Sequence, residues 1–109
     1  MADNRRSSAR YIVSLPCSIA IDGKALSWTM INLSLGGALI DAGEKFGMGA
    51  RAQVSFRIST LEDPIDIGAT VRWSDAKALG LQFDGLRARE VWGLNEFFKS
   101  LSSPAAAAQ

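Results

Sequence analysis

The chain has 109 residues, of which 48% are hydrophobic and 21% are charged, and its formal net charge is +1. This length suits one domain, and the composition excludes a wholly disordered chain and a protein that binds nucleic acid or membranes through bulk charge. The single cysteine excludes an intrachain disulfide, and the absence of histidine removes the usual general base and the commonest metal ligand.

The same features set expectations for chemistry and location. We expect no catalytic residues, no metal site and no cofactor. The sequence holds no apolar run of about 18 residues, so we expect no membrane insertion. The N-terminus has no apolar signal-peptide core, and one cysteine suits a reducing compartment, so we expect a cytoplasmic protein.

In chain order, residues 1–9 are polar and show no periodicity, which predicts a flexible arginine-containing segment. Alternating apolar side chains then predict β-strands at residues 11–21, 25–33, 38–41, 53–59, 65–73 and 79–83. Apolar spacings of three and four predict a helix at residues 86–101, and residues 102–109 are predicted to be a disordered tail. Five or six strands and one helix favour a mainly β domain over residues 10–101, a small antiparallel barrel with the helix covering one end.

Several single positions carry local predictions. The dipeptide Asp-Gly at 22–23 is a hairpin-turn signal, and Pro16, which lacks an N–H, indicates an edge or a bulge in the first strand. Trp28 and Trp73 lie on apolar strand faces, so we expect both to pack in the core. Trp92 lies in the helix, where docking of the helix and contact with a partner both stay open.

Two stretches carry residues suited to binding. Arg5, Arg6 and Arg10 precede the first strand, and each guanidinium offers five donors in a planar fork that suits phosphate and also stacks on flat rings. The alternative is a solvated basic tail. The second stretch, residues 32–37, has the sequence NLSLGG and lies at the end of the second strand and in the turn after it. Its amide and hydroxyl groups can bind a ligand, although the stretch alone also fits an ordinary turn.

Together, in this order and spacing, the two stretches resemble the motifs of the PilZ domain family. Arg6 and Arg10 match its R-x-x-x-R motif, whereas its [D/N]-x-S-x-x-G motif is matched by Asn32, Ser34 and Gly37. The last strand pair of the family has V-x-W and G-[IVL]-x-F patterns, which are matched by Val71, Trp73, Gly80, Leu81 and Phe83. The resemblance runs from residue 5 to about residue 100 and shows no departure at the motif positions.

The resemblance implies a six-stranded antiparallel β-barrel with a C-terminal helix, and a non-enzymatic bacterial receptor for cyclic di-GMP. Arg6 and Arg10 would contact phosphates and stack on guanine faces. Asn32 would bind a guanine edge, somewhat more weakly than the Asp that many members carry. Ser34 would hydrogen-bond guanine or phosphate. The two glycines of the motif stretch, Gly36 and Gly37, complete the expected site, and Gly37 would leave room for the flat base.

Arg5 leads to a hypothesis about stoichiometry. A basic residue just before R-x-x-x-R goes with two stacked ligand molecules in this family, so we expect an intercalated cyclic di-GMP dimer. The ligand would clamp the arginine segment onto the barrel, a disorder-to-order change. The changed surface would then bind an unidentified effector protein, with motility or exopolysaccharide production as the regulated output.

Two rival interpretations stay open. One is a PilZ-type protein-interaction module without ligand binding, which the intact motifs disfavour. The other is a barrel that binds single-stranded nucleic acid, which needs exposed aromatic side chains among basic ones. We expect no nucleic-acid partner, because the aromatic residues lie mostly on apolar faces. Elsewhere we expect an inert buried Cys17, solvated Asp63, Asp66, Glu90 and Glu96, and surface charges at Arg72, Arg87 and Arg89, one of which could extend the basic rim of the site.

Overall fold

Six strands and one helix make up the part of the chain that the structure, a computed structural model, describes. This part comprises residues 10–108, with side chains up to residue 101; Arg5, Arg6 and the rest of the predicted N-terminal segment lie outside it. The elements are β1 (Tyr11–Ile21), β2 (Lys24–Leu33), β3 (Gly37–Asp41), β4 (Arg51–Phe56), β5 (Ile65–Ser74), β6 (Ala78–Phe83) and α2 (Ala88–Ala108). The predicted strands are therefore confirmed to within one residue, except that β4 covers residues 51–56 rather than 53–59.

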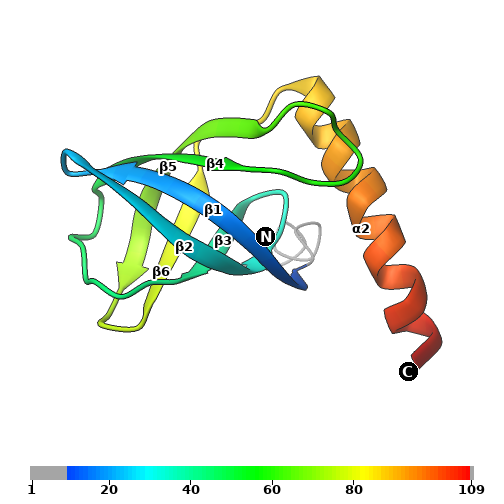
Figure 1. Ribbon diagram of the computed structural model, residues 1–109, viewed down its shortest axis with the longest axis horizontal. Helices are drawn as coiled ribbons and strands as arrows, with labels where there is room; N and C mark the ends of the chain where they lie inside the picture. The colour runs from blue at the N-terminus through cyan, green and yellow to red at the C-terminus, as the bar shows by residue number, and fades with distance from the viewer. Residues whose placement is uncertain (1–9, 109) are drawn as a thin grey trace, which may run out of the picture.

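The strands close into an antiparallel barrel in the order β1-β2-β3-β6-β5-β4 (Figure 1). Residues 22–23 form the predicted two-residue turn between β1 and β2, with positive φ at both positions. On its other side β1 pairs with β4 only from Cys17 to Ile21. The preceding residue, Pro16, has no N–H and lies where β1 no longer pairs with β4, which is the edge position predicted for it.

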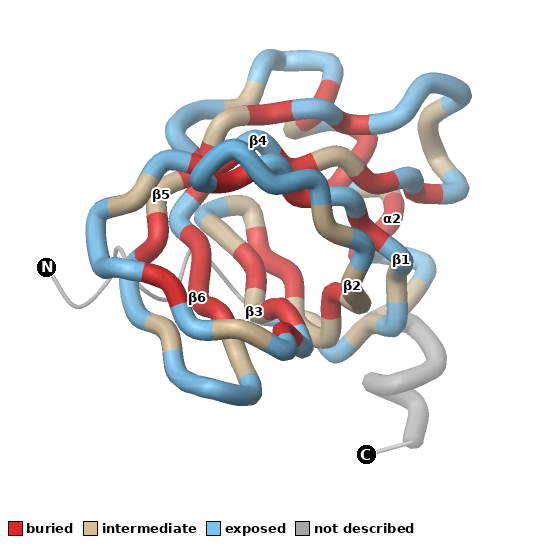
Figure 2. The backbone as a smooth tube through the Cα atoms, turned by 60° about the vertical axis from the view of Figure 1, so that its left-hand side comes forward, coloured by how far each residue is buried: buried red, intermediate tan, exposed pale blue. Residues whose placement is uncertain are grey.

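Buried and exposed residues alternate along the strands (Figure 2). The buried side chains form one hydrophobic core. Along β1, Cys17, Ile19 and Ile21 are buried and the residues between them are exposed. Trp28 packs against this core, as predicted. Full burial of one large aliphatic side chain stabilises the fold by about 1.5–3 kcal/mol. The inner face therefore sets the orientation of each strand and leaves the outer face available for binding.

The alternation of faces breaks near the end of β5, and the prediction that Trp73 packs in the core is wrong. Val71 pairs with Leu81, and the next pair joins Trp73 to Gly80, so β5 carries one extra residue, Arg72. Such a β-bulge moves the following side chain to the other face. Val71 is buried, Arg72 is exposed, and Trp73 is 46% exposed on the outside of the barrel.

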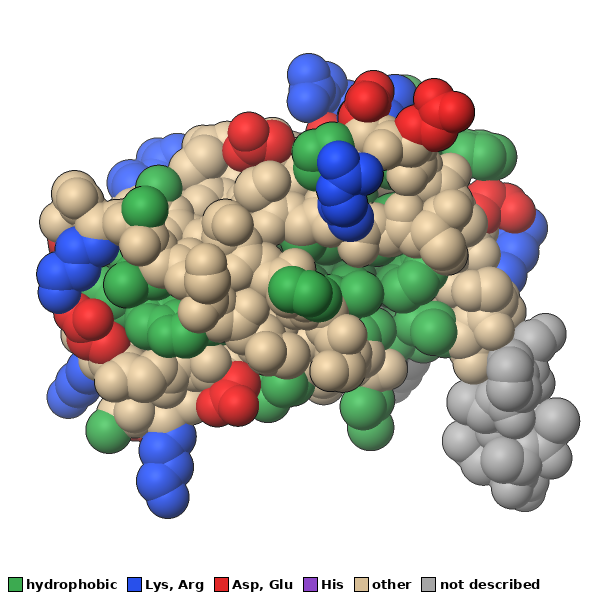
Figure 3. Space-filling model, in the orientation of Figure 1, with side chains coloured by type: hydrophobic (Ala, Val, Ile, Leu, Met, Phe, Trp, Pro, Cys, Tyr) green, Lys and Arg blue, Asp and Glu red, His purple; other side chains and the backbone are tan. Residues whose placement is uncertain are grey.

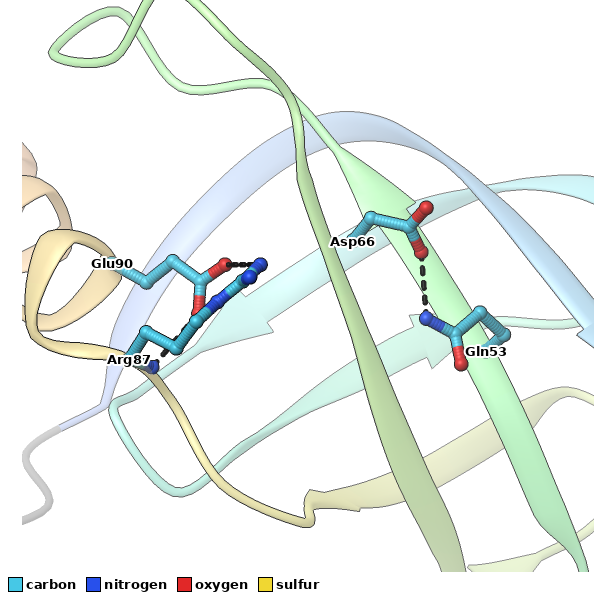
Figure 4. A network of polar contacts seen from close by, with 4 residues as sticks. All are labelled: Gln53, Asp66, Arg87 and Glu90. Carbon is cyan, nitrogen blue, oxygen red and sulfur yellow. Dashed lines mark hydrogen bonds and ion pairs between the residues drawn. The ribbon is translucent and has the colours of Figure 1, made fainter.

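The first turn of α2 is held by Glu90, which the sequence analysis wrongly expected to be solvated. Its side chain is 1% exposed. The Arg87 backbone N–H donates to Glu90 Oε1 at 2.9 Å, and Arg87 Nη2 donates to Oε2 at 3.0 Å (Figure 4). Burial raises the pKa of Glu90, but the hydrogen bonds and charge of Arg87 outweigh it and hold that pKa below its ordinary value. The carboxylate thus caps the helix start, where the dipole favours negative charge.

The apolar side of α2 packs against one end of the barrel, as predicted (Figure 1). Leu94, Phe97 and Phe98 are buried there. Tyr11, the first residue of β1, stacks on Phe98 with ring centroids 4.3 Å apart and planes 12° apart. Figure 3 shows apolar side chains gathered between the barrel and α2. The start of β1 and the middle of α2 are therefore in direct contact.

The outer side of α2 carries an exposed tryptophan, and the helix extends beyond the predicted residue 101. Trp92 is 57% exposed, so it does not dock the helix. The helix continues to Ala108 beyond residue 101, which is consistent with the high helix propensity of the final alanines. From residue 102 on, the side chains lie outside the described part, and the tail predicted there stays a prediction. Within residues 10–108, no helix has both the length and the hydropathy to cross a bilayer.

Candidate functional site

A pocket on the outer face of the barrel brings the two predicted motifs together. Its volume is about 850 Å³, within the range of small-molecule sites. β3 and β6 form the floor, the start of β1 and the end of β2 border one side, and β5 borders the other. The lining residues are Arg10, Asn32, Ser34, Gly36, Gly37, Ala38, Leu39, Arg72, Trp73, Gly80, Leu81, Gln82 and Phe83.

The pocket is cationic. Arg10 and Arg72 line it, and none of the described residues around it is acidic. Neither arginine forms an ion pair with another described residue, whereas Arg51, outside the pocket, donates to Asp84 at 2.6 Å. A guanidinium without a carboxylate partner keeps its planar fork of donors for a bidentate anion. The electrostatics of the pocket therefore favour an anionic ligand.

A cross-strand row joins the two sides of the pocket. Asn32, Leu39, Gly80 and Trp73 are successive partners across β2, β3, β6 and β5. Neighbouring strands lie about 4.8 Å apart, so this row spans about 14 Å. The indole of Trp73 lies over Gly80, because a Cβ there would be 2.4 Å from indole Nε1 and 2.7 Å from Cε2. The indole thus gives the pocket a half-exposed, flat surface over Gly80.

Ser34 organises the turn between β2 and β3. Its Oγ accepts hydrogen bonds from the Gly36 N–H at 3.1 Å and the Gly37 N–H at 3.2 Å, and donates to the Gly37 carbonyl at 3.3 Å. The Phe83 N–H donates to the Gly36 carbonyl at 2.9 Å, which ties the turn to β6. One hydroxyl offers one donor and two acceptor sites, and all three are used here. In this structure Ser34 shapes the pocket by holding its turn.

Gly37 allows two strands to approach closely. A Cβ on Gly37 would lie 2.1 Å from the backbone oxygen of Leu81 on β6. Any side chain at this position would therefore push β3 away from β6. The sequence analysis explained this glycine by room for a flat base, whereas the structure shows that the neighbouring strand itself requires it.

Outside the pocket, the described residues offer little reactive chemistry. Burial raises the pKa of the Cys17 thiol to about 11, although its hydrogen bond to the Trp28 carbonyl, at 3.5 Å, lowers the pKa in part. The thiol is therefore protonated at neutral pH and is a poor nucleophile. Residues 10–101 contain no group of three or more side chains that could hold a metal ion.

Comparison with known proteins identifies the family. The sequence profile described as "PilZ domain" matches residues 4–99, which is most of the chain. The chain belongs to the PilZ domain family. The match spans every residue of the two predicted motifs. No curated protein matches the full sequence significantly.

Solved structures share the fold of this PilZ domain. MotI/DgrA, the inhibitor of motility from Bacillus subtilis, aligns with a TM-score of 0.72 and 19% identity over 94% of this chain and 52% of that one. The PilZ domain of YcgR from Escherichia coli, solved with c-di-GMP, aligns with a TM-score of 0.66 and 19% identity. This alignment covers 95% of this chain and 96% of the YcgR domain. PlzA from Borreliella burgdorferi, in complex with c-di-GMP, aligns with a TM-score of 0.68 and 22% identity. This alignment covers 89% of this chain and 42% of PlzA. This chain thus spans about half the length of MotI/DgrA and nearly all of the YcgR domain.

The pocket of the PilZ domain contains most of the predicted site residues. It brings together Arg10, Asn32, Ser34, Gly36 and Gly37. Arg5 and Arg6 lie outside the described residues, so their place in the site stays a prediction.

Three residues that line the pocket were not among the site residues predicted from the sequence. Trp73 was assigned to the core, Gln82 was not considered, and Arg72 was one of three surface arginines proposed as an extension of the rim. The signal for Trp73 was the glycine in the following strand, Gly80, since a large ring opposite a glycine indicates that one covers the other.

This set of groups suits binding rather than acid–base chemistry. The described lining offers guanidinium, amide and indole groups and no carboxylate. On the face shown in Figure 3, Lys and Arg side chains are scattered singly, most of them near the outline, rather than gathered in a stripe. A groove for single-stranded nucleic acid needs such a stripe with aromatic side chains along it. The geometry therefore favours a small anionic ligand.

Proposed function

We propose that this PilZ domain is a cytoplasmic, non-enzymatic receptor for cyclic di-GMP that relays the signal to a partner protein. The observation that carries the proposal is the pocket, in which Arg10 and Arg72 have no acidic neighbour in the described lining and flank an amide and an exposed indole. Cyclic di-GMP offers the matching groups, two phosphates and two guanines. The fold shared with YcgR and PlzA, both solved with c-di-GMP, supports the choice of ligand.

The described motif residues have distinct roles in this proposal. Arg10 contacts a phosphate and stacks on a guanine, which combines charge with a cation–π contact. Asn32 hydrogen-bonds a guanine edge. Ser34 acts first through the turn that it holds, and a direct contact of its hydroxyl with the ligand requires one of its present hydrogen bonds to open.

Arg5 and Arg6, from the segment before Arg10, would close over the ligand. Ordering each residue of that segment costs about 1–2 kcal/mol in backbone entropy, which charge-assisted hydrogen bonds must offset. The extra cation at Arg5 suits four phosphates better than two, so we propose an intercalated pair of ligand molecules. Saturation at one cyclic di-GMP per chain would refute the pair and leave the receptor intact.

Isothermal titration with cyclic di-GMP tests the receptor. We expect the Arg10→Ala variant to bind at least tenfold more weakly than wild type, since a hydrogen bond to a charged group contributes about 1.5–3 kcal/mol. Arg89→Ala is the matched control, because Arg89 is an exposed arginine on α2 outside the pocket. Both variants remove one positive charge, and only the first should weaken binding. No heat from folded wild-type protein would refute the receptor.

The relay to a partner is the second half of the proposal. MotI/DgrA is an inhibitor of motility, which supports motility as an output; exopolysaccharide production is the other output that we propose. The alternative is an interaction module that does not bind the ligand. An affinity for its partner that is the same with and without cyclic di-GMP would favour that alternative.

A further inference from the structure

The start of β1 is held by strand pairing on one side and by α2 on the other. Tyr11, the first residue of β1, pairs with Leu33 of β2, whereas the pairing with β4 begins only further along the strand. The Tyr11 ring stacks on Phe98 of α2 with centroids 4.3 Å apart. A register shift after Ile12 also interrupts the ladder with β2. The helix therefore takes the place of a second neighbouring strand at this point.

The residue directly before this anchor belongs to the pocket. Arg10 is exposed and lines the pocket, and the next residue, Tyr11, is half-buried against α2. One planar peptide unit joins the two residues and keeps their Cα atoms about 3.8 Å apart, so the backbone cannot shift at one without shifting at the other. The contact with α2 therefore fixes the point from which the Arg10 side chain reaches the ligand.

The two halves of α2 are attached to the barrel in different ways. The first half has anchors that do not involve β1. Thr60 Oγ1 donates to the Gly93 carbonyl at 2.6 Å, and Leu61 lies so close to Gly93 that a Cβ there would be 2.5 Å from the Leu61 Cγ. The second half, residues 97–101, includes the buried Phe98 with Tyr11 stacked on it. The second half can therefore loosen from β1 while the first half stays attached.

We propose that α2 positions Arg10 for cyclic di-GMP through the stack of Tyr11 on Phe98, so that ligand binding and docking of the second half of α2 stabilise each other. A bound ligand holds Arg10 in place, and the adjacent Tyr11 then stays on Phe98. Coupling between two sites is reciprocal, so docking raises ligand affinity by the same factor by which the ligand favours docking. This coupling rests on the proposed receptor function and makes α2 the element through which the relay to a partner begins.

Isothermal titration of the full chain with cyclic di-GMP tests the coupling through two variants. Tyr11→Phe keeps the stacked ring and removes a hydroxyl that has no hydrogen-bond partner among the described residues, so it is the matched control. Tyr11→Leu keeps an apolar side chain and removes the ring. We expect Tyr11→Phe to bind as wild type does and Tyr11→Leu to bind about two- to tenfold more weakly, the range of one aromatic pair. Thermal unfolding checks that both variants are folded.

Hydrogen exchange of the backbone amides of residues 97–101 gives a second readout, which a purely structural role of Tyr11 would not move. Saturating cyclic di-GMP should slow exchange there by the same factor of about two to ten in wild type and Tyr11→Phe. In Tyr11→Leu the ligand should leave this exchange unchanged. An equal effect of the ligand in Tyr11→Leu and Tyr11→Phe would refute the coupling, because the ring would then not carry it.

The same measurements separate this coupling from the receptor function. If wild type binds cyclic di-GMP and the exchange of residues 97–101 does not change, the coupling is refuted and the receptor stands. This comparison needs only wild-type protein, so it decides the question even where Tyr11→Leu does not fold. If folded wild-type protein does not bind cyclic di-GMP, the receptor and the coupling fail together.

Discussion

Replacing Gly80 by alanine tests whether the position of the Trp73 indole matters for binding. The new Cβ would lie 2.4 Å from indole Nε1 and 2.8 Å from Cδ1, whereas ordinary contacts are 3.4–4 Å. The ring must therefore move by about 1 Å, which it can do because it is half-exposed on the outer face. Stability should change little, because the strain of an off-rotamer side chain, about 0.5–1.5 kcal/mol, is offset by the lower chain entropy of alanine in the unfolded state.

Ligand affinity should fall much more than stability. Stacking of a base on an aromatic side chain contributes about 1–3 kcal/mol, so we expect Gly80→Ala to weaken cyclic di-GMP binding by about 5- to 150-fold. Titration calorimetry measures the affinity, and thermal unfolding measures the stability. Gly47→Ala is the matched control, since a Cβ there meets nothing within 4 Å. Wild-type affinity in folded Gly80→Ala protein would refute the prediction that a guanine base of the ligand stacks on the Trp73 indole.

Three further predictions concern the fold. The pKa of Glu90 is lowered in the folded state, so its stabilisation is present above the pKa of an unfolded Glu and is lost as the pH falls through the folded pKa. Glu90→Gln should therefore flatten the acid side of a plot of melting temperature against pH, and a parallel curve would contradict this role. Phe98→Ala should destabilise the fold by about 3–5 kcal/mol in urea unfolding, because Phe98 is buried and stacks on Tyr11; a loss below about 1 kcal/mol would contradict that packing. Iodoacetamide should modify Cys17 slowly at pH 8 and rapidly in urea, since burial raises its pKa to about 11; equal rates would contradict its burial.

The barrel was predictable because each strand buries one face. A period of two in the apolar residues appears directly in the sequence, and the inner residues of β1 and β4 are the predicted ones. Trp73 was not predictable in this way. The side of the barrel on which Trp73 lies depends on an extra residue in the pairing of β5 with β6. The register between two strands cannot be read from the sequence of either strand alone.

The site was predictable only in part for a related reason. Motif spacing located Asn32 and the turn after it, because their hydrogen-bonding groups lie close together in the sequence. The roles of Ser34 and Gly37 needed the fold, since one depends on hydrogen bonds within the turn and the other on the Leu81 carbonyl of a distant strand. The burial of Glu90 likewise depends on how α2 packs.

The extra residue of β5 separates two kinds of evolutionary constraint. Val71 and the alternate residues before it, Ile65, Ile67 and Ala69, belong to the inner rows, where a change of volume disturbs packing. Positions 72 and 73 face outward together, so substitutions there can diversify without repacking the interior. Substitution of this adjacent pair can therefore change the outer surface beside the pocket while the packed interior stays the same.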